Sequence, residues 1–237
     1  MNMKLSLLIP IYNEERTLVA VLDRIRKVQL GVGKEIILVN DGSKDHSKEI
    51  IEEYLKKNKS TREIQWKFYS KENGGKGSAL RLGLQHATGD IVIIQDADLE
   101  YKPEEISLLI KELQKGKSDV IYGSRILNRK NKTAYLSYYL GNRFLSIVTS
   151  ILYGKAITDM ETCYKLIPLK IFKELSISRN RFDIEPEITA KILRKGYAIK
   201  EIPITYAPRS KEEGKKIGWR DGLTALGVLF SLRMKRK

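Results

Sequence analysis

Hydrophobic and polar residues alternate in blocks along the first half of the chain. Short apolar runs, which are typical of buried strands, are separated by segments in which apolar residues recur at the helical spacing. The runs cover residues 5–11, 35–39, 64–69, 91–94 and 119–122, and the helical segments lie around residues 18–28, 50–55, 79–84 and 106–113. Strands that alternate with helices predict an α/β fold, with a Rossmann-like, mostly parallel sheet and helices on both of its faces.

The pattern changes after Arg125. Residues 135–153 form an apolar segment of helical length, but Asn142 and Arg143 lie at its centre. A central arginine costs a membrane-spanning helix about 3 kcal/mol or more, so we expect an interfacial or core helix. Further along we expect a polar turn leading into a strand at 158–167, a helix at 186–194, a strand at 198–206, a charged loop at 211–216 and an amphipathic helix at 219–232. The predicted organisation is one domain over residues 1–222 and a basic amphipathic tail over residues 223–237.

Polar or glycine residues follow each strand predicted in the first half. Glu14, Asp41, Asp96 and Arg125 follow individual strands, and a glycine-rich segment at 73–77 follows another. Parallel strands end at one edge of their sheet, and open α/β folds bind ligands there. We therefore expect these residues to lie close together.

Three carboxylates, Asp96, Asp98 and Glu100, follow the apolar run at 91–94. Alternate residues of an extended segment point the same way, so these side chains are expected to converge. Hard oxygen ligands favour Mg²⁺ or Mn²⁺, and such sites usually share the metal with substrate phosphates. The alternative is a polar turn that leads into the helix after Pro103.

The glycine-rich segment at 73–77 has the sequence NGGKG. Glycines permit a close approach of the backbone to a ligand, and the N-terminus of the following helix favours anions. Lys76 adds a positive charge. The segment lacks the lysine and hydroxyl pair of a P-loop, so we expect a different kind of phosphate site or, alternatively, a flexible loop.

The composition is that of an ordinary globular domain with a strong basic excess. The chain of 237 residues has a net charge of +15 and a single cysteine, Cys163. One cysteine excludes an internal disulfide and fits a reducing compartment, and no signal peptide is visible. The charge predicts an anionic partner, either a membrane surface, a phosphorylated substrate or nucleic acid. No nucleic-acid recognition motif is present, so we expect no nucleic acid.

An ordered set of motifs resembles the family 2 glycosyltransferases of the GT-A fold. The set consists of residues 9–14 (IPIYNE), 39–43 (VNDGS), 72–77 (ENGGKG) and 96–98 (DAD). The segments 123–125 (GSR), 158–164 (TDMETCY) and 214–219 (GKKIGW) are similar to the polyprenyl-phosphate branch, typified by dolichyl-phosphate mannose synthase. The resemblance covers nearly the whole chain, and its strength lies in the order of the motifs.

The resemblance implies a nucleotide-sugar donor of the GDP-mannose or UDP-glucose type. The residues implied to bind it are Pro10, Tyr12, Glu14, Asp41, Lys76, Asp96, Arg209 and Lys215. It also implies a Mg²⁺ or Mn²⁺ ion on Asp96, Asp98 and Glu100 that neutralises the leaving nucleoside diphosphate. Many relatives place an amide where this chain has Glu100.

The implied acceptor is a polyprenyl or dolichyl phosphate, and the implied reaction is an inverting hexosyl transfer. Asp98, Arg125 and Arg143 are the expected catalytic residues, with the arginines gripping the acceptor phosphate. A lipid phosphate is already anionic at neutral pH and needs no general base. A sugar hydroxyl, the alternative acceptor, needs one, and the candidates are Asp159, Glu161, Asp183, Glu185 and Glu187. A non-catalytic membrane-surface module is a further alternative.

The end of the chain predicts peripheral attachment to the cytoplasmic face of a membrane. Residues 233–237 (RMKRK) are basic, and Leu223, Leu226, Leu229 and Phe230 provide apolar contacts. Basic residues near an anionic leaflet contribute about 1 kcal/mol each. The helix at 135–153 would be a second contact. The alternative is that both helices close the core.

Overall fold

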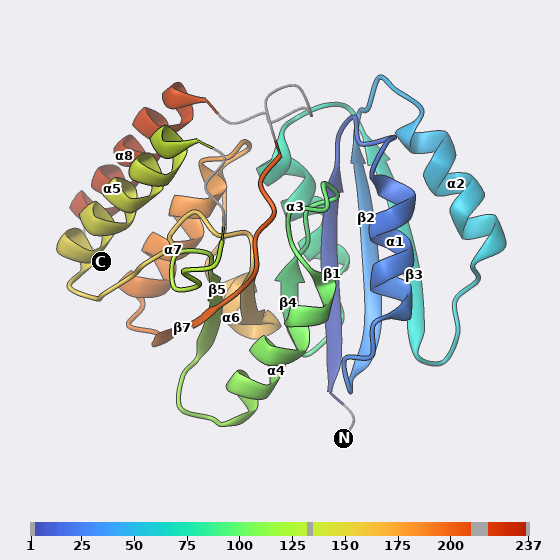
Figure 1. The fold of residues 1–237 in the computed structure, drawn as a ribbon, viewed down its shortest axis with the longest axis horizontal. Coiled ribbons are helices and arrows are strands. Elements are labelled where there is room, and N and C mark those ends of the chain that lie inside the picture. Colours follow the sequence, from blue (N-terminus) through green and yellow to red (C-terminus); the bar gives the residue numbers. More distant parts are fainter. Residues whose placement is uncertain (1–2, 132–134, 210–217, 236–237) are drawn as a thin grey trace.

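The computed structural model describes residues 3–131, 135–209 and 218–235, and this part of the chain contains one seven-stranded sheet. The strand order is β3-β2-β1-β4-β6-β5-β7 (Figure 1). Neighbouring strands are parallel, except that β6 runs antiparallel to both β4 and β5. The strands are β1 (Lys4–Ile11), β2 (Gly33–Asp41), β3 (Ile64–Lys71), β4 (Ile91–Ile94), β5 (Val120–Ser124), β6 (Lys165–Pro168) and β7 (Ile199–Pro203). The prediction of a mostly parallel α/β sheet is confirmed.

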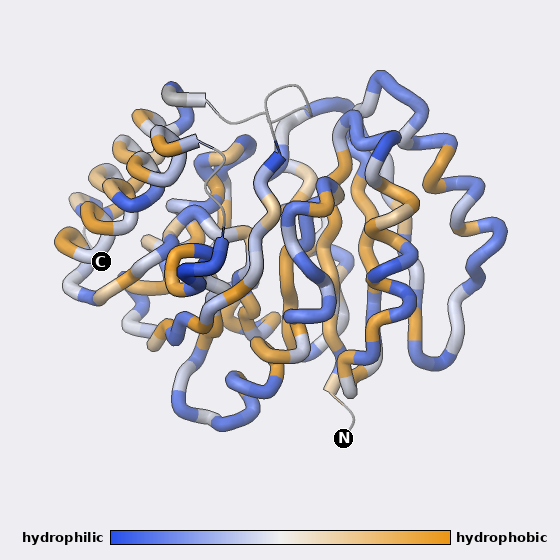
Figure 2. Tube along the Cα trace, viewed as in Figure 1, coloured by the Kyte–Doolittle hydropathy of each residue, from blue (hydrophilic) through white to orange (hydrophobic). Residues whose placement is uncertain are grey.

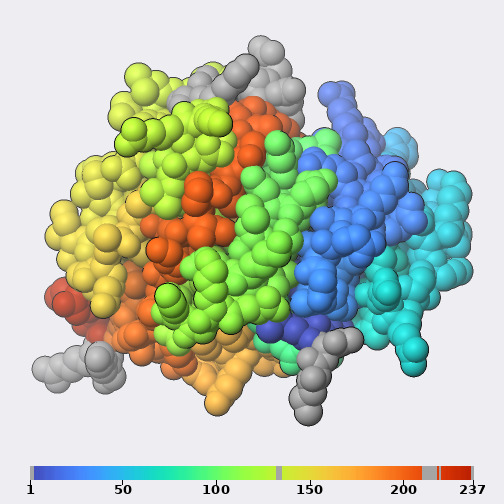
Figure 3. Space-filling model, turned by 60° about the horizontal axis from the view of Figure 1, so that its bottom comes forward, coloured from blue at the N-terminus to red at the C-terminus, as the bar shows by residue number. Residues whose placement is uncertain are grey.

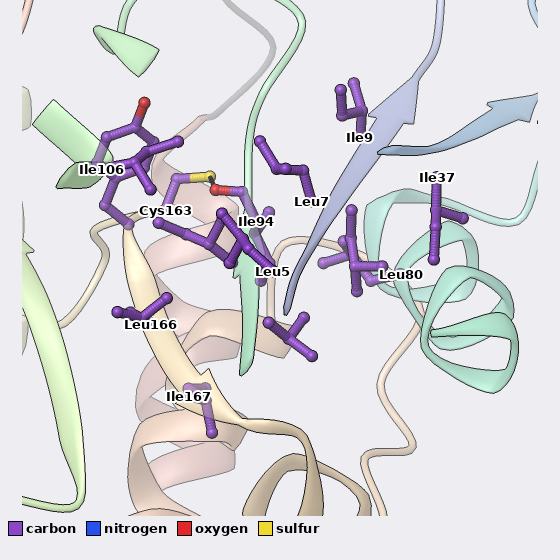
Figure 4. Packing of buried hydrophobic residues seen from close by; sticks show 14 of the residues in the cluster. Leu5, Leu7, Ile9, Ile37, Leu80, Ile94, Ile106, Cys163, Leu166 and Ile167 are labelled. Carbon is purple, nitrogen blue, oxygen red and sulfur yellow. Dashed lines mark hydrogen bonds between the residues drawn. The ribbon is translucent and has the colours of Figure 1, made fainter. Parts of the chain in front are cut away.

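Helices cover both faces of the sheet, with α1 and α4 in front of it in Figure 1 and α3 behind it. The helices are α1 (Leu18–Lys27), α2 (Ser47–Lys57), α3 (Lys76–His86), α4 (Ile106–Gln114), α5 (Leu136–Tyr153), α6 (Leu169–Glu174), α7 (Ile184–Arg194) and α8 (Trp219–Met234), with a short 3₁₀ helix at Pro103–Glu105. Gly83 lets α3 pack closely, because a Cβ there would lie 3.3 Å from a methyl carbon of Leu8. The main hydrophobic core of the domain contains side chains of β1, β2, β4 and β6, and Figure 4 shows part of it.

A second hydrophobic cluster joins the last helix to the domain. It consists of Leu145, Ile157, Met160, Ala190, Ala225, Val228, Leu229 and Leu232, from α5, α7, α8 and the loop after α5. The boundary that we expected between residues 222 and 223 therefore falls inside α8, a helix that packs on the domain. Leu229 is fully buried, so its predicted membrane contact is wrong.

Hydropathy along the chain follows this architecture. The central strands are mostly hydrophobic, and hydrophobic positions recur along α5 and α8 at the left of the molecule (Figure 2). Within the described residues, neither α5, α8 nor any other helix combines the length and the hydropathy needed to cross a membrane. The expectation that residues 135–153 do not form a spanning helix agrees with this.

A buried carboxylate, that of Glu35, connects several segments near the amino-terminal end of β2. Glu35 is fully buried in β2 and accepts hydrogen bonds from the Ser6 hydroxyl at 2.6 Å and from the Thr88 backbone N–H at 2.8 Å. The Lys67 ammonium lies 2.7 Å from it. Burial alone would raise the pKa of Glu35, but the hydrogen bonds from Lys67, Ser6 and Thr88 outweigh it and lower the pKa to about 2.

This low pKa predicts a loss of stability in acid. Because the folded-state pKa lies below the ordinary value, Glu35 stabilises the fold above about pH 4.5, and this contribution disappears as the pH falls toward about 2. The full effect is about 3 kcal/mol. In urea unfolding, Glu35→Gln should be less stable than the wild type at neutral pH, and the difference should shrink in acid. A difference that stays constant with pH would contradict this role.

Candidate active site

The carboxyl ends of the strands form the upper edge in Figure 1 and bring most of the predicted site residues together. Pro10 and Tyr12 are half-buried at the end of β1, and Glu14 is buried just beyond it. Asp41 ends β2, and Lys76 begins α3. Lys215 lies outside the described residues.

Asp41 holds the glycine-rich loop in place. Its carboxylate accepts hydrogen bonds from the backbone N–H groups of Gly74, at 3.0 Å, and Gly75, at 2.7 Å. The Lys71 ammonium lies 2.9 Å from the same carboxylate. Gly75 has a φ of +92°, and a Cβ there would lie 2.6 Å from the carbonyl oxygen of Asn180, so the loop requires glycine at this position. Asp41 thus shapes the loop, and its contact with a nucleotide stays a prediction.

Lys76 links the loop to the metal-binding motif. Its ammonium lies 2.9 Å from Asp96 and 3.1 Å from Glu185. Glu185 also pairs with Lys165, whose side chain is completely buried. Burial alone would lower the pKa of Lys76, but the negative charges around it, that of Asp96 foremost, raise the pKa well above its ordinary value. Asp96, Lys76, Glu185 and Lys165 thus form a chain of ion pairs in which acidic and basic side chains alternate.

Residues 204–209, which we call the strap, carry Arg209 across the edge of the sheet. Thr205 donates to Glu105 at 2.8 Å, and the Arg209 backbone N–H donates to Glu100 at 2.7 Å. In Figure 3 the orange-red chain that includes the strap runs over the surface beside the green residues around α4. The Arg209 guanidinium lies 2.9 Å from Glu14 and 3.4 Å from Asp98. The strap therefore bridges the ends of β1 and β4.

The extended backbone that we expected for residues 96–100 is wrong, and the role of Glu100 as a metal ligand stays a prediction. The segment is a turn and not an extended strand, with Leu99 at a φ of +63°. The carboxylate of Glu100 accepts hydrogen bonds from the Tyr206 hydroxyl, at 2.6 Å, and from the strap backbone. Within the described ranges, no group of three or more acidic, histidine or cysteine side chains is arranged to hold a metal.

Asp96 and Asp98 still fit a divalent cation that is shared with a ligand. Burial raises the pKa of Asp98 to about 7, and the charges of Asp96 and Glu100 add to the effect. This cluster of negative charge has oxygen donors, which suit Mg²⁺ or Mn²⁺, and Mg²⁺ is usually held by one or two carboxylates together with substrate phosphates. The chemistry of the donors therefore fits a shared metal on these two aspartates.

The Arg125 side chain is held in place by the Asp159 carboxylate. Its guanidinium makes a bidentate ion pair with Asp159, with hydrogen bonds of 2.7 and 2.8 Å, and it lies 5.0 Å from the ring centre of Tyr206. The Asn142 amide donates to the same carboxylate at 2.8 Å. Burial alone would raise the pKa of Asp159, but Arg125 outweighs it and lowers the pKa. Asp159 is fully buried and orients a cation.

Arg143 follows Asn142 on α5, and Asn142 is the residue that contacts the Asp159 carboxylate. Arg143 is half-buried. The structure gives it no hydrogen bond or ion pair to any residue in the described ranges. The contact of Arg143 with an acceptor stays a prediction.

Several residues of the site were not predicted with their observed roles. Glu185 pairs with both Lys76 and Lys165, Tyr206 stacks on Arg125, and Asn73 donates to the Asp41 carbonyl at 2.9 Å. None of these residues is a sequence neighbour of its partner, the shortest separation being the 20 residues between Lys165 and Glu185. The only sequence signal was the acidic run at residues 183–187 in an otherwise apolar segment.

Comparison with known proteins identifies relatives. The model of the family "Glycosyl transferase family 2" matches residues 6–176. A dolichyl-phosphate beta-glucosyltransferase of Trichomonas vaginalis is 31% identical over 216 residues, which cover 85% of this chain and 65% of the relative. An undecaprenyl-phosphate 4-deoxy-4-formamido-L-arabinose transferase of Pseudomonas fluorescens is 30% identical, covering 96% of this chain and 63% of the relative. The chain thus spans slightly less than two thirds of the length of these relatives.

Solved structures show the same fold. Glucosyl-3-phosphoglycerate synthase from Mycobacterium tuberculosis, in complex with phosphoglyceric acid, superimposes with a TM-score of 0.74 at 18% identity, covering 99% of this chain and 81% of that one. A complex of that synthase with Mn²⁺, UDP and glucosyl-3-phosphoglycerate gives a TM-score of 0.72 at 18% identity, covering 99% and 81% of the two chains. The α/β fold with its mostly parallel sheet is therefore GT-A-like.

Proposed function

Because this chain belongs to glycosyltransferase family 2, we propose that it transfers a hexose from a nucleoside-diphosphate sugar to a polyprenyl phosphate, with inversion at the sugar. The observation that carries the proposal is the bidentate pair of Arg125 with the fully buried Asp159. The carboxylate at this position orients a cation and is inaccessible as a general base. An anionic phosphate requires a cation and no base.

The donor would bind along the strand ends, between the glycine-rich loop and the strap. Asp96 and Asp98 would hold Mg²⁺ or Mn²⁺, which neutralises charge on the leaving nucleoside diphosphate. Lys76 and Arg209 already lie on these carboxylates and would contribute positive charge beside the phosphates. The structural neighbour bound to Mn²⁺ and UDP supports this arrangement.

The named relatives support the lipid acceptor. One is a dolichyl-phosphate transferase and another an undecaprenyl-phosphate transferase. An assay of UDP-glucose and GDP-mannose with Mn²⁺ and a polyprenyl phosphate in detergent, read by mass spectrometry, tests the proposal. A hexosyl lipid phosphate is expected with one of the donors. Hydrolysis or transfer to other acceptors alone would contradict the proposed acceptor.

A sugar hydroxyl acceptor is the second candidate, and Glu161 favours it. Burial raises the pKa of Glu161 to about 7, with Lys165 opposing the shift and Glu185 adding to it. A carboxylate with such a pKa is suited to act as a general base. If it did, replacing Glu161 with Gln would remove turnover without changing the affinity for the donor.

Arg143 provides a test of the acceptor side. Arg143→Ala should lower transfer to the lipid phosphate by about 10-fold or more, because a charge-assisted hydrogen bond contributes about 1.5–3 kcal/mol. Nucleotide affinity, measured by calorimetry, should change little. Arg62→Ala, in an exposed loop, is the control and should leave both quantities unchanged. Equal losses of nucleotide affinity and transfer would place Arg143 outside the acceptor site.

The outer face of α5 and α8 supports peripheral attachment to a membrane. Exposed apolar side chains recur on α5 at the helical spacing, namely Leu136 (67% exposed), Leu140 (55%), Phe144 (55%), Ile147 (47%) and Ile151 (76%). On α8, Leu223 and Phe230 are exposed as well. Arg233 and Lys235 follow on the same helix end, and the net charge is +15. Exposed apolar side chains together with basic residues suit an anionic bilayer, and the single cysteine fits its cytoplasmic side.

Vesicle binding tests this surface. The protein should bind anionic vesicles more strongly than neutral ones, and binding should weaken as salt rises. Phe144→Ser with Ile151→Ser should reduce binding without loss of stability, because both side chains are exposed. The control is Leu108→Ser, an exposed apolar position on α4. Equal binding to neutral and anionic vesicles would rule out the electrostatic part of this attachment.

A further inference from the structure

Glu161 differs from four other carboxylates near the strand ends because, within the described residues, it makes no ion pair. Asp96 pairs with Lys76, Asp98 with Arg209, Asp159 with Arg125 and Glu185 with Lys165. Glu161 makes no ion pair or hydrogen bond with any residue in the described part of the chain, and its Oε1 atom is buried without a partner. A buried polar atom without a partner costs free energy, so its presence at a candidate site requires an explanation.

In the sequence, Glu161 lies between residues of the acceptor side and residues of the donor side of the candidate site. Two residues before it, Asp159 holds Arg125 on the acceptor side. Two residues after it, the Cys163 sulfur lies 3.8 Å from the Lys76 ammonium, which contacts Asp96 on the donor side. The residue as a whole is half-buried, while its Oε1 atom is covered by the protein. In the chain, Glu161 therefore stands between a residue of the acceptor side and a residue of the donor side, where we expect the sugar to pass.

The chemistry of a carboxylate decides what it can bind there. An ionised carboxylate only accepts hydrogen bonds, and it repels the phosphates of the donor and the acceptor. The hydroxyl groups of a hexose are donors, and two neighbouring ones can share the two oxygens of one carboxylate. Such bonds are charge-assisted and stronger than those between neutral groups. Hydroxyl donors would also satisfy the unpartnered Oε1 atom.

We propose that Glu161 binds hydroxyl groups of the donor hexose and thereby distinguishes the sugar nucleotide from the free nucleotide. This role rests on the proposed function, and it makes Glu161 a determinant of sugar specificity. It does not depend on whether the acceptor is a lipid phosphate or a sugar hydroxyl. The residue then contributes to the binding of the sugar and not to that of the nucleoside diphosphate.

Calorimetry with Mn²⁺ tests the proposal on UDP and UDP-glucose, and on GDP and GDP-mannose. For the pair that the wild type binds, Glu161→Ala should weaken sugar-nucleotide binding by about 10-fold or more, while the nucleoside diphosphate keeps its affinity within about 2-fold. Glu161→Gln retains one acceptor oxygen and should lie between the wild type and Glu161→Ala. The control is Glu104→Gln, which removes the same charge from an exposed ion pair with Arg24.

The other outcomes overturn the proposal in distinguishable ways. An equal loss for both ligands would show a role in the nucleotide site or the fold, and unchanged binding of both would show no contact with the sugar. Lost turnover with unchanged binding would instead show a general base. If the wild type binds none of these nucleotides, the proposed function itself is wrong.

Discussion

Asp98→Asn is expected to abolish metal-dependent transfer, with a loss of about 100-fold or more, while the protein remains folded. An amide lacks the charge needed to hold a divalent cation with Asp96. The substitution should not lower stability, because burial and neighbouring carboxylates raise the pKa of Asp98 to about 7 and make its ionised form unfavourable. The measurements are turnover in Mn²⁺ and the urea midpoint.

The control for this experiment is Asp119→Asn, an exposed aspartate next to β5 at the opposite edge of the sheet. It removes the same charge and should leave transfer unchanged. A folded Asp98→Asn protein that retains near-normal turnover would eliminate Asp98 as a metal ligand.

Glu185→Ala should destabilise the fold by about 3–5 kcal/mol, because it leaves a buried ammonium without a carboxylate partner. Lys165 is completely buried and pairs with Glu185, which also contacts Lys76. Urea unfolding measures the loss. The double substitution Lys165→Met and Glu185→Met should recover part of it, since both members of the buried pair are then removed and Lys76 keeps Asp96.

Glu104→Gln is the matched comparison for this ion pair. Glu104 pairs with Arg24 at 2.7 Å, but its side chain is 54% exposed. Water screens such pairs, so its loss should cost less than about 1 kcal/mol. A Glu185→Ala variant as stable as Glu104→Gln would contradict the account of the buried charges.

The strands and helices were largely predictable because their signals are local. Buried parallel strands appear as apolar runs, and α1 shows its buried face as Leu18, Val21, Leu22 and Ile25. The direction of β6 was not predictable, because it depends on a distant contact. The ion pair of Asp159 with Arg125 holds the turn before β6 at the carboxyl end of β5, so β6 must run antiparallel to β5.

The site was predictable as a set of residues but not as a set of contacts. The motifs indicated that Lys76, Asp96 and Arg125 lie at one edge of the sheet, and Lys76 and Asp96 form an ion pair there. The error at residues 96–100 came from assuming an extended backbone, which the positive φ of Leu99 breaks. Arg209 of the strap contacts Glu14 across a sequence separation of 195 residues, and no local pattern indicates such a contact.

The most direct test of the central claim compares two acceptors that differ only in the phosphate. The purified protein, Mn²⁺ and the accepted sugar nucleotide would be incubated in detergent with either undecaprenyl phosphate or undecaprenol, and the products resolved by mass spectrometry. The account predicts that only the lipid phosphate gains one hexose, because the site offers arginines for a phosphate and holds Asp159 away from base catalysis. Glycosylated undecaprenol, with undecaprenyl phosphate unchanged, would contradict it.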